Sequence, residues 1–137
     1  MFYETIEDIT ADAGIRVRGN SLEEVFCKSI LATFNEITDI ENIEIREEHV
    51  LEAEGTLPFL LADLINRALV LHESKGFVAN RCEVEKLSNT YVRVRLKGER
   101  FNPKKHSSKL VIKAATYHRL KIEREGKLYV AEVIFDI

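Results

Sequence analysis

The last two residues of the chain carry two carboxylates, the side chain of Asp136 and the α-carboxylate of Ile137. They follow residues 129–135, which are rich in strand-forming types and have apolar side chains on both alternating faces. This pattern predicts a strand covered on both faces rather than a frayed tail. Carboxylates held together at the end of a fixed strand repel each other, and a divalent cation relieves that repulsion. The tail is therefore a candidate for half of an oxygen-ligand metal site.

A further acidic position lies near the start of the chain, where Asp12 stands between Thr10 and Gly14 in a polar run that predicts a turn. One interpretation is an Asx-turn, in which the carboxylate only organises a hairpin. The other is a cation ligand, which gains support if folding brings Asp12 beside the carboxylates of Asp136 and Ile137. Three oxygen donors with open positions for water suit Ca²⁺, Mg²⁺ or Mn²⁺.

A second group of reactive side chains lies in residues 113–118, with the sequence KAATYH. In a strand, Lys113 and Tyr117 share one face and His118 lies on the other, and the small residues between them allow close approach of another group. Lys113 and His118 are candidates for acid–base chemistry beside a metal, or for contact with a phosphate or a carboxylate of a partner. The alternative is a strand whose polar ends only extend into solvent.

Several classes of active site have no support in the chain. The four histidines lack mutual ligand spacing, and Cys27 and Cys82 are not in a CxxC pair, so we expect no zinc site. No GxSxG, P-loop or GxGxxG motif occurs, so the sequence supports neither a nucleophilic serine hydrolase nor a nucleotide-binding loop. We expect both cysteines to be reduced and structural, Cys27 in a helix and Cys82 in a strand.

The composition favours one compact domain covering residues 1–137, since 45% of the 137 residues are hydrophobic and the net charge is only −3. No segment approaches the roughly 20 apolar residues of a membrane helix. The N-terminus has neither the basic nor the apolar region of a signal peptide. We therefore expect a cytoplasmic protein without membrane contact.

The charge is unevenly distributed along the chain. Residues 93–127 contain twelve Lys or Arg and three Asp or Glu, which gives a net charge of +9. The remainder of the chain contains eight Lys or Arg and twenty Asp or Glu, which gives a net charge of −12. This asymmetry indicates either an acidic partner such as RNA or neutralisation between the two parts within the fold. The basic loop 98–109 has a single aromatic residue and lacks a stacking platform for bases. We expect it to be a mobile solvated loop or a loop that contacts another protein.

Two helices are predicted from capping signals and apolar stripes. Ser21, with Glu24 three residues later, forms a capping box at the start of an apolar helical stripe. Thr56 is the predicted cap of a second, strongly apolar helix that has Pro58 in its first turn and ends at Gly76. The second helix should be the central helix of the core, because most of its positions are apolar.

The rest of the chain predicts strands. They are residues 2–7 and 15–18 around a polar turn at 8–14, an edge strand within 43–54 anchored by Ile43, Ile45 and Val50, and residues 78–87, 91–97, 110–117, 120–125 and 128–137. Alternation in residues 91–97 places Val92, Val94 and Leu96 inward, in a hairpin with residues 78–87. The pattern predicts an α+β fold, with two helices packed on a mostly antiparallel sheet.

In this order, these segments resemble the archease family over essentially the whole chain. The matching segments are residues 8–15 (DITADAGI), residues 19–26 (GNSLEEVF), Leu64-Ile65-Asn66, Gly98-Glu99, residues 113–118 and the terminal Phe135-Asp136-Ile137. The KAxTYH run and the terminal Asp-Ile are the specific parts of the match. The chain departs from the family at Ile9, because the family usually has a histidine at this position, in the run His-Thr-Ala-Asp.

The resemblance implies a protein without a reaction of its own that assists the RtcB-type RNA ligase in tRNA splicing and RNA repair. That ligase joins RNA ends bearing a 2′,3′-cyclic or 3′-phosphate to a 5′-hydroxyl, with GTP and divalent metal. The family promotes guanylylation of the ligase and its multiple turnover, and so meets RNA through the ligase. The resemblance also implies a metal site formed by Asp12, Asp136 and the Ile137 carboxylate, with Lys113 as the next candidate.

The residues by themselves leave two other functions open. One is a general RNA-binding or chaperone module that uses residues 93–127, whose affinity for RNA would depend on salt. The other is a metal-dependent hydrolase with His118 or Lys113 as general base, which would need a pocket and an open metal position.

Overall fold

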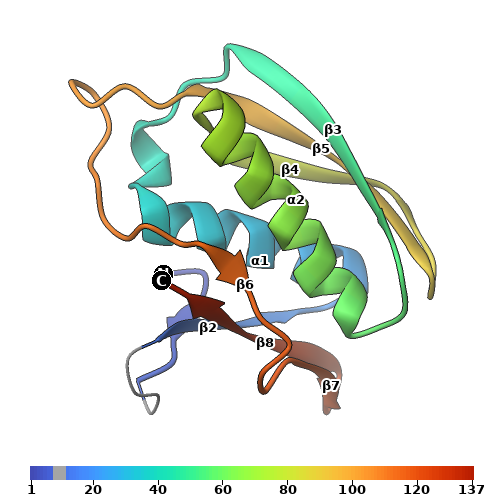
Figure 1. Cartoon of the computed structure of the whole chain (residues 1–137). Helices are drawn as coiled ribbons and strands as arrows, with labels where there is room; N and C mark the ends of the chain where they lie inside the picture. The colour runs from blue at the N-terminus through green and yellow to red at the C-terminus, as the bar shows by residue number, and fades with distance from the viewer. Residues whose placement is uncertain (8–11) are drawn as a thin grey trace.

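The computed structural model describes residues 1–7 and 12–137, and these contain two α-helices and eight strands in two antiparallel sheets (Figure 1). The helices are α1, Leu22–Ile37, and α2, Phe59–Lys75. The first sheet has the order β1-β2-β8-β6, with β7 also paired to β8, and the second has the order β3-β5-β4. The predicted α+β class is confirmed, but the strands form two sheets where we expected one.

The strands of the first sheet are β1 Glu4–Thr5, β2 Ala13–Gly19, β6 Ala114–Ala115, β7 Lys121–Glu125 and β8 Leu128–Asp136. Those of the second are β3 Glu47–Glu54, β4 Phe77–Leu87 and β5 Tyr91–Arg100, and a 3-10 helix, Ile40–Asn42, precedes β3. Helix α1 is packed between the sheets, against β2 and β8 on one side and β4 on the other (Figure 1). Helix α2 covers the second sheet and also contacts β6.

Helix α1 begins at the predicted capping box. The Ser21 hydroxyl accepts a hydrogen bond from the backbone N–H of Glu24 at 3.1 Å, and the Glu24 carboxylate accepts one from the N–H of Asn20 at 3.0 Å. These two bonds satisfy backbone donors that no helical turn can satisfy. In the apolar stripe below the cap, Phe26 and Phe34 are fully buried, and Leu22 and Leu31 are partly buried.

Helix α2 begins later than we predicted. Pro58 occupies the N-cap position and Phe59 is the first helical residue, and Thr56 contributes its carbonyl, which accepts from the N–H of Leu60 at 2.8 Å. Thr56 is therefore not the N-cap. The predicted end is confirmed, because Gly76 adopts the left-handed conformation with φ 69°. Within the described residues, no helix is long and apolar enough to span a membrane.

The second sheet contains the predicted hairpin, in which β4 and β5 are antiparallel neighbours and Val92, Val94 and Leu96 are fully buried. β3 is an edge strand paired with β5, as predicted. Its proposed anchors are only partly correct, since Ile43 is buried but Ile45 and Val50 are exposed. Val50 lies on the outer face of β3, whereas Ile43 and Ile45 both precede the strand.

β8 is the covered strand that the apolar pattern of residues 129–135 predicted. It is paired along its length with β2, while β7 pairs with its first half and β6 with its end. Every residue from 130 to 135 is buried, including Glu132, whose carboxylate contacts Arg16 at 2.9 Å and Lys121 at 3.6 Å. Glu132 is thus a structural ion-pair partner.

The predicted strand at residues 110–117 is wrong except for the two residues of β6. The preceding chain bonds to the end of α1, because the N–H groups of Lys109 and Leu110 donate to the carbonyls of Ile37 and Glu36, both at 3.0 Å. These carbonyls belong to the last turn of the helix, which has no helical donors for them. The backbone of this segment therefore caps a helix where we expected it to extend a sheet.

The basic loop within residues 98–109, which we expected to be mobile and solvated or to contact another protein, is anchored by Glu99, and residues 102–105 are exposed. The Glu99 carboxylate accepts hydrogen bonds from the N–H of Glu44 at 2.6 Å, from Lys105 at 2.9 Å and from His106 at 3.1 Å. His106 is only 3% exposed, and its Nδ1 accepts from the N–H of Asn102 at 2.8 Å. Because a backbone N–H can only donate, Nε2 carries the proton that binds Glu99.

The charge asymmetry is largely neutralised within the fold. Basic side chains of residues 93–127 pair with acids elsewhere in the chain: Arg93–Glu85, Arg95–Glu48, Lys97–Glu83, Lys105–Glu44, Lys109–Asp39 and Lys121–Glu132. For these side chains, neutralisation within the fold is therefore the correct interpretation of the charge pattern.

Cys27 and Cys82 form a disulfide, which contradicts our expectation of two reduced cysteines. Cys27 lies on α1 and Cys82 on β4, two elements that pack directly against each other, and their Cα atoms are 5.4 Å apart. This separation is within the range that a disulfide can bridge. The 55-residue separation in sequence concealed the contact, because neither cysteine has a local partner.

The disulfide predicts a measurable contribution to stability. The bond closes a loop of 55 residues, and loss of that closure in a Cys27→Ala/Cys82→Ala variant should lower the free energy of unfolding by about 4 kcal/mol. Urea denaturation with and without a reductant checks this value. The reductant should destabilise the wild type and leave the double variant unchanged. Detection of two free thiols in the natively folded, unreduced protein would contradict the assignment.

The Glu99 cluster predicts a pH-dependent contribution to stability. Burial raises the pKa of Glu99, but hydrogen bonds from Glu44, Lys105 and His106 outweigh burial and lower that pKa to about 2. Because this pKa is lower in the folded state, the ionised carboxylate stabilises the fold at pH values above the ordinary pKa of glutamate. The stabilisation is lost as the pH falls toward 2. Glu99→Gln should therefore lower the free energy of unfolding by about 2 kcal/mol at pH 7, with partial screening of the ion pairs taken into account.

Urea denaturation of wild type and Glu99→Gln at pH 7 and at pH 3 measures this contribution. The difference in free energy should shrink at the lower pH. Glu83→Gln is the matched control, since its carboxylate is exposed and pairs with Lys97 at 3.2 Å, and it should change stability by less than about 1 kcal/mol. A Glu99→Gln effect that is the same at both pH values would disprove the electrostatic origin.

Candidate functional site

The register of the first sheet brings the two predicted acidic positions to one edge. Ala13 of β2 pairs with Phe135 of β8, so Asp12 and Asp136 each lie one step beyond this pair, on neighbouring strands. On the other side of β8, Ala114 pairs with Asp136. The end of β8 therefore lies between β2 and β6, and Asp12 and Asp136 belong to the same edge of the sheet. We call this edge, with Asp12, Asp136 and Ile137, the acidic edge.

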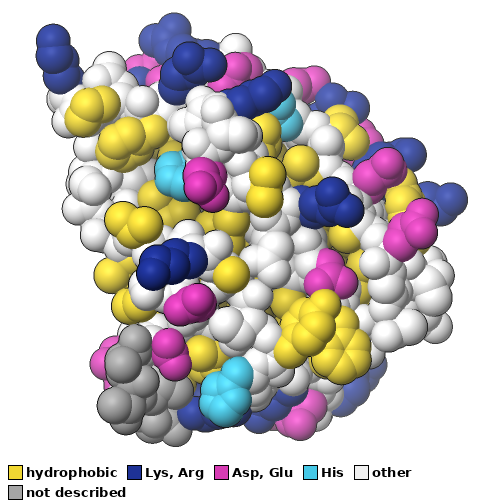
Figure 2. Space-filling view, viewed as in Figure 1, with side chains coloured by type: hydrophobic (Ala, Val, Ile, Leu, Met, Phe, Trp, Pro, Cys, Tyr) yellow, Lys and Arg dark blue, Asp and Glu magenta, His cyan; other side chains and the backbone are white. Residues whose placement is uncertain are grey.

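The acidic edge is open to solvent. Asp12 and Asp136 are exposed, and Ile137 is 40% exposed although β8 is buried up to Phe135. Acidic, basic and histidine side chains all lie on this face of the molecule in Figure 2, in the region where Figure 1 shows β6 and the end of β8. Carboxylates that are both exposed and fixed by strands are accessible to an ion or a partner without desolvation of a buried charge.

The donor chemistry fits a hard divalent cation. The acidic edge offers carboxylate oxygens, which suit Ca²⁺, Mg²⁺ or Mn²⁺ better than softer metals. Within residues 1–7 and 12–137, no three side chains of His, Cys, Asp or Glu form a group that could hold a metal. Asp12 and Asp136 alone therefore do not make up a metal site, and a cation at this edge would also need the Ile137 carboxylate and ligands from water or a partner.

Ile9 lies outside the described residues, as does most of the turn predicted at residues 8–14. The strands on either side of that turn are antiparallel, with Thr5 paired to Ile15, which agrees with the predicted hairpin. The departure from the family pattern at Ile9 therefore has no structural account.

Lys113 is tied to the acidic edge through its backbone. Its N–H donates to the carbonyl of Asp136 at 2.8 Å, while its side chain is exposed and lines a neighbouring cavity. His118 is also exposed, and its N–H donates to the hydroxyl of Thr116 at 3.3 Å. The two residues thus flank the end of β6 on the surface, where a partner can reach both.

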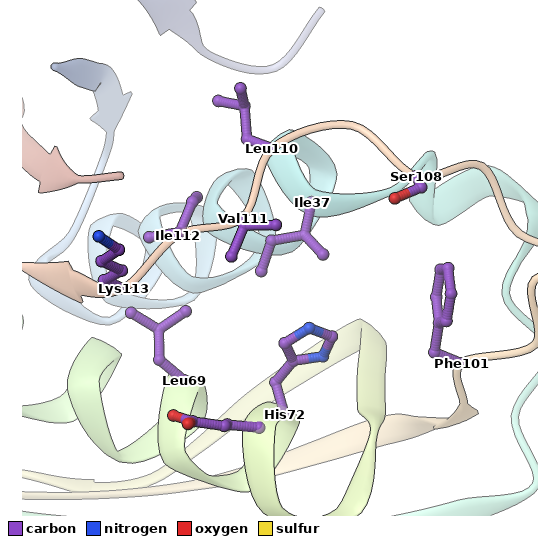
Figure 3. A pocket seen from close by; sticks show the side chains of 10 residues that line it. Ile37, Leu69, His72, Phe101, Ser108, Leu110, Val111, Ile112 and Lys113 are labelled. Carbon is purple, nitrogen blue, oxygen red and sulfur yellow. The ribbon is translucent and has the colours of Figure 1, made fainter. Parts of the chain in front are cut away.

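The cavity beside Lys113 has a volume of about 450 Å³ and lies between α2 and residues 108–113 (Figure 3). Its walls are mostly apolar, formed by Ile37, Leu69, Phe101, Leu110, Val111 and Ile112, with His72, Glu73, Ser108 and Lys113 as the polar members. The sequence did not indicate this cavity, because its walls come from α1, α2 and two separate parts of one loop.

Two polar side chains of α2 hold residues 113–118 in place, and sequence reasoning did not assign them this role. Asn66 accepts from the N–H of Ala115 at 2.7 Å and donates to the carbonyl of the same residue at 3.0 Å. Asp63 accepts from the Tyr117 hydroxyl at 2.5 Å, and this hydrogen bond raises the pKa of Tyr117. The detectable signal was a pair of polar residues, three positions apart, in the apolar first half of the helix.

The Tyr117 ring also packs on Phe59, the first residue of α2, with ring centroids 4.9 Å apart. Phe59, Asp63 and Asn66 are four and three residues apart, so they form one stripe along the helix. Within residues 113–118, this stripe contacts Ala115 and Tyr117. The segment that carries Lys113 and His118 is therefore fixed by β8 on one side and by α2 on the other.

Comparison with known proteins identifies the family. The model of the Archease protein family matches residues 3–137. A protein archease of Pyrococcus furiosus is 39% identical over 134 residues, which cover 93% of this chain and 94% of that protein. A protein archease of Methanopyrus kandleri is 37% identical over 141 residues, which cover 100% of both chains.

Solved structures of similar proteins have the same fold. The solution structure of a Methanobacterium thermoautotrophicum protein matches with a TM-score of 0.82 and 29% identity, and covers 99% of both chains. A crystal structure from Thermotoga maritima, described as an archease and possible chaperone, matches with a TM-score of 0.65 and 26% identity over 98% of this chain and 97% of that one. The family match over nearly the whole chain, with relatives of this identity and coverage, shows that the chain belongs to the archease family.

Proposed function

We propose that this protein activates the RtcB-type RNA ligase, the enzyme that joins RNA ends bearing a 2′,3′-cyclic or 3′-phosphate to a 5′-hydroxyl. In this proposal it promotes guanylylation and multiple turnover of the ligase, in the cytoplasm, and performs no reaction of its own. Membership of the archease family supports this function. The single observation that carries it is the sheet register that brings Asp12 and Asp136 to one exposed edge.

In the same proposal, Asp12, Asp136 and the Ile137 carboxylate hold a divalent cation, Ca²⁺ or else Mg²⁺ or Mn²⁺. The cation supplies positive charge that offsets the repulsion among these carboxylates and the negative charge of phosphates at the ligase active site. The partial ligand set supports a role in transfer or positioning, since an open set leaves coordination positions for groups of a partner. Lys113 and His118 flank this edge and are the candidates for contact with the ligase.

Ligation under multiple turnover tests the proposal, with the cognate ligase far below the RNA substrate and with or without this protein. Wild type should drive many turnovers per ligase. Asp12→Asn and Asp136→Asn keep the shape of each side chain but remove its charge, and each should reduce the stimulated rate roughly 10- to 100-fold. Ligase guanylylation with labelled GTP, measured in parallel, should fall by the same factor.

Glu83→Gln is the control for these variants, because it removes an exposed carboxylate from the second sheet, away from the acidic edge. It should stimulate the ligase as the wild type does. Full stimulation by both Asp12→Asn and Asp136→Asn would reject the role of the acidic edge. No stimulation by wild type would reject the ligase as the partner.

A general RNA-binding or chaperone module based on residues 93–127 is the alternative function. The internal ion pairs of Arg93, Arg95, Lys97, Lys105 and Lys109 count against it, because a phosphate would have to displace a fixed carboxylate at each position. Filter binding to single-stranded RNA at about 50 mM and 200 mM salt separates the two functions, since a protein with 6–10 phosphate contacts loses roughly 10³- to 10⁵-fold in affinity over this range. We expect weak binding with a shallow dependence on salt.

A further inference from the structure

Asn66 takes the place of a neighbouring strand at the outer edge of β6. Its Oδ1 accepts from the N–H of Ala115 at 2.7 Å and its Nδ2 donates to the carbonyl of Ala115 at 3.0 Å. This exchange of one donor and one acceptor is what an antiparallel strand offers to a hydrogen-bonded residue. β6 has only two residues paired with β8, and Asn66 gives it a hydrogen-bonding partner on its other side.

We propose that Asn66 is a positioning residue for the acidic edge. By holding Ala115, it fixes the segment that binds the last carbonyl of β8, and so sets where the carboxylates of Asp136 and Ile137 lie relative to Asp12. This inference rests on the proposed metal site, and it adds a residue on α2 that would not itself contact the cation.

The coupling passes through backbone hydrogen bonds on either side of Ala115. The N–H of Lys113 donates to the carbonyl of Asp136 at 2.8 Å, and the N–H of Thr116 donates to the carbonyl of Ile134 at 2.9 Å. The Thr116 hydroxyl reaches the same Ile134 carbonyl at 2.9 Å. Ala115 lies between these bonds, so a shift of Ala115 disturbs both of them. The peptide that links Asp136 to Ile137 loses its anchor when the first bond is lost.

The chemistry at this position requires an amide. Ala115 is 5% exposed, so its N–H and C=O would each be left buried without a partner if Asn66 were apolar. A carboxylate could accept from the N–H but could not donate to the carbonyl, and a glutamine has the same groups on a longer stem. The Asp63–Tyr117 hydrogen bond supports the far end of the segment but touches neither group of Ala115.

Calorimetric titration with calcium tests the inference by comparing the calcium affinity of the wild type with that of Asn66→Leu. Leucine has the same number and branching of side-chain heavy atoms as asparagine, and it removes both hydrogen bonds. Loss of a group that orients metal ligands should weaken calcium affinity roughly 10- to 100-fold. Asn80→Leu is the matched control, since Asn80 lies on β4 of the second sheet and its amide donates to the Ile43 carbonyl at 2.6 Å. It removes a comparable hydrogen bond and should leave calcium affinity within about twofold of wild type.

Hydrogen exchange on the wild type tests the same coupling without any variant, in case Asn66→Leu does not fold. If the Asn66–Ala115 bonds favour calcium binding, calcium must by linkage favour those bonds to the same extent. Saturating calcium should therefore slow exchange of the Ala115 amide, by roughly tenfold if the affinity effect is tenfold. Exchange at the Cys82 amide in β4 of the second sheet should not change.

The outcomes separate this inference from the proposed function. Calcium binding by wild type, with unchanged affinity in Asn66→Leu or unchanged exchange at Ala115, rejects Asn66 as a positioning residue and leaves the metal site standing. Absence of calcium binding by wild type rejects the proposed site, and the inference with it. If calcium binding is weakened in Asn66→Leu but not in Asn80→Leu, and calcium slows exchange at Ala115, the result supports both the metal site and the positioning role of Asn66.

Discussion

Hydrogen bonding along both edges of β8 determines where the candidate site residues lie. β2 pairs with one edge over seven residues, and β7 and then β6 pair with the other. Because each pairing has a defined register, the end of β8 has only one position relative to the start of β2 and to β6. Asp12, Asp136 and Lys113 are far apart in sequence, and they meet only because these registers place them at the same end of the sheet.

The same central strand explains the stability of an edge that carries several charges. Residues 130–135 are buried on both faces, so the strand is anchored in the core up to the residue before Asp136. Repulsion between the exposed carboxylates costs little in water and cannot displace a strand held in this way. Rigidity of the strand and exposure of its end together give a surface on which carboxylates are held without being desolvated.

Helix α2 combines two tasks that its sequence keeps on separate faces. Its apolar face, with Leu60, Leu61, Leu64 and Ile65 fully buried, packs in the core. The stripe of Phe59, Asp63 and Asn66 holds residues 113–118 through an aromatic contact and three hydrogen bonds. The loop that leads to this segment is anchored in turn by Glu99 and by the end of α1. The basic segment is thus fixed at several points, and most of its charge is balanced by nearby acids.

The sequence by itself determined those features that depend on local pattern. Periodicity and capping signals predicted both helices, the β4–β5 hairpin and the covered strand β8, because apolar spacing and turn residues act over a few positions. The carboxylates of Asp12 and Asp136 were recognised as candidates by residue type, and the resemblance to archease named the family. Whether these acids lie together was beyond the sequence, since it depends on strand register.

Tertiary structure alone decided the contacts between residues that are distant in the chain. The Cys27–Cys82 disulfide, the anchoring of the basic loop by Glu99, and the replacement of a long strand at 110–117 by a two-residue strand all came from such contacts. In each case local propensity was overruled by a partner: a facing cysteine, a buried carboxylate, or the free carbonyls at the end of α1. Backbone and polar groups bind whichever partner the packing of helices and sheets brings within reach, and a linear sequence does not state that geometry.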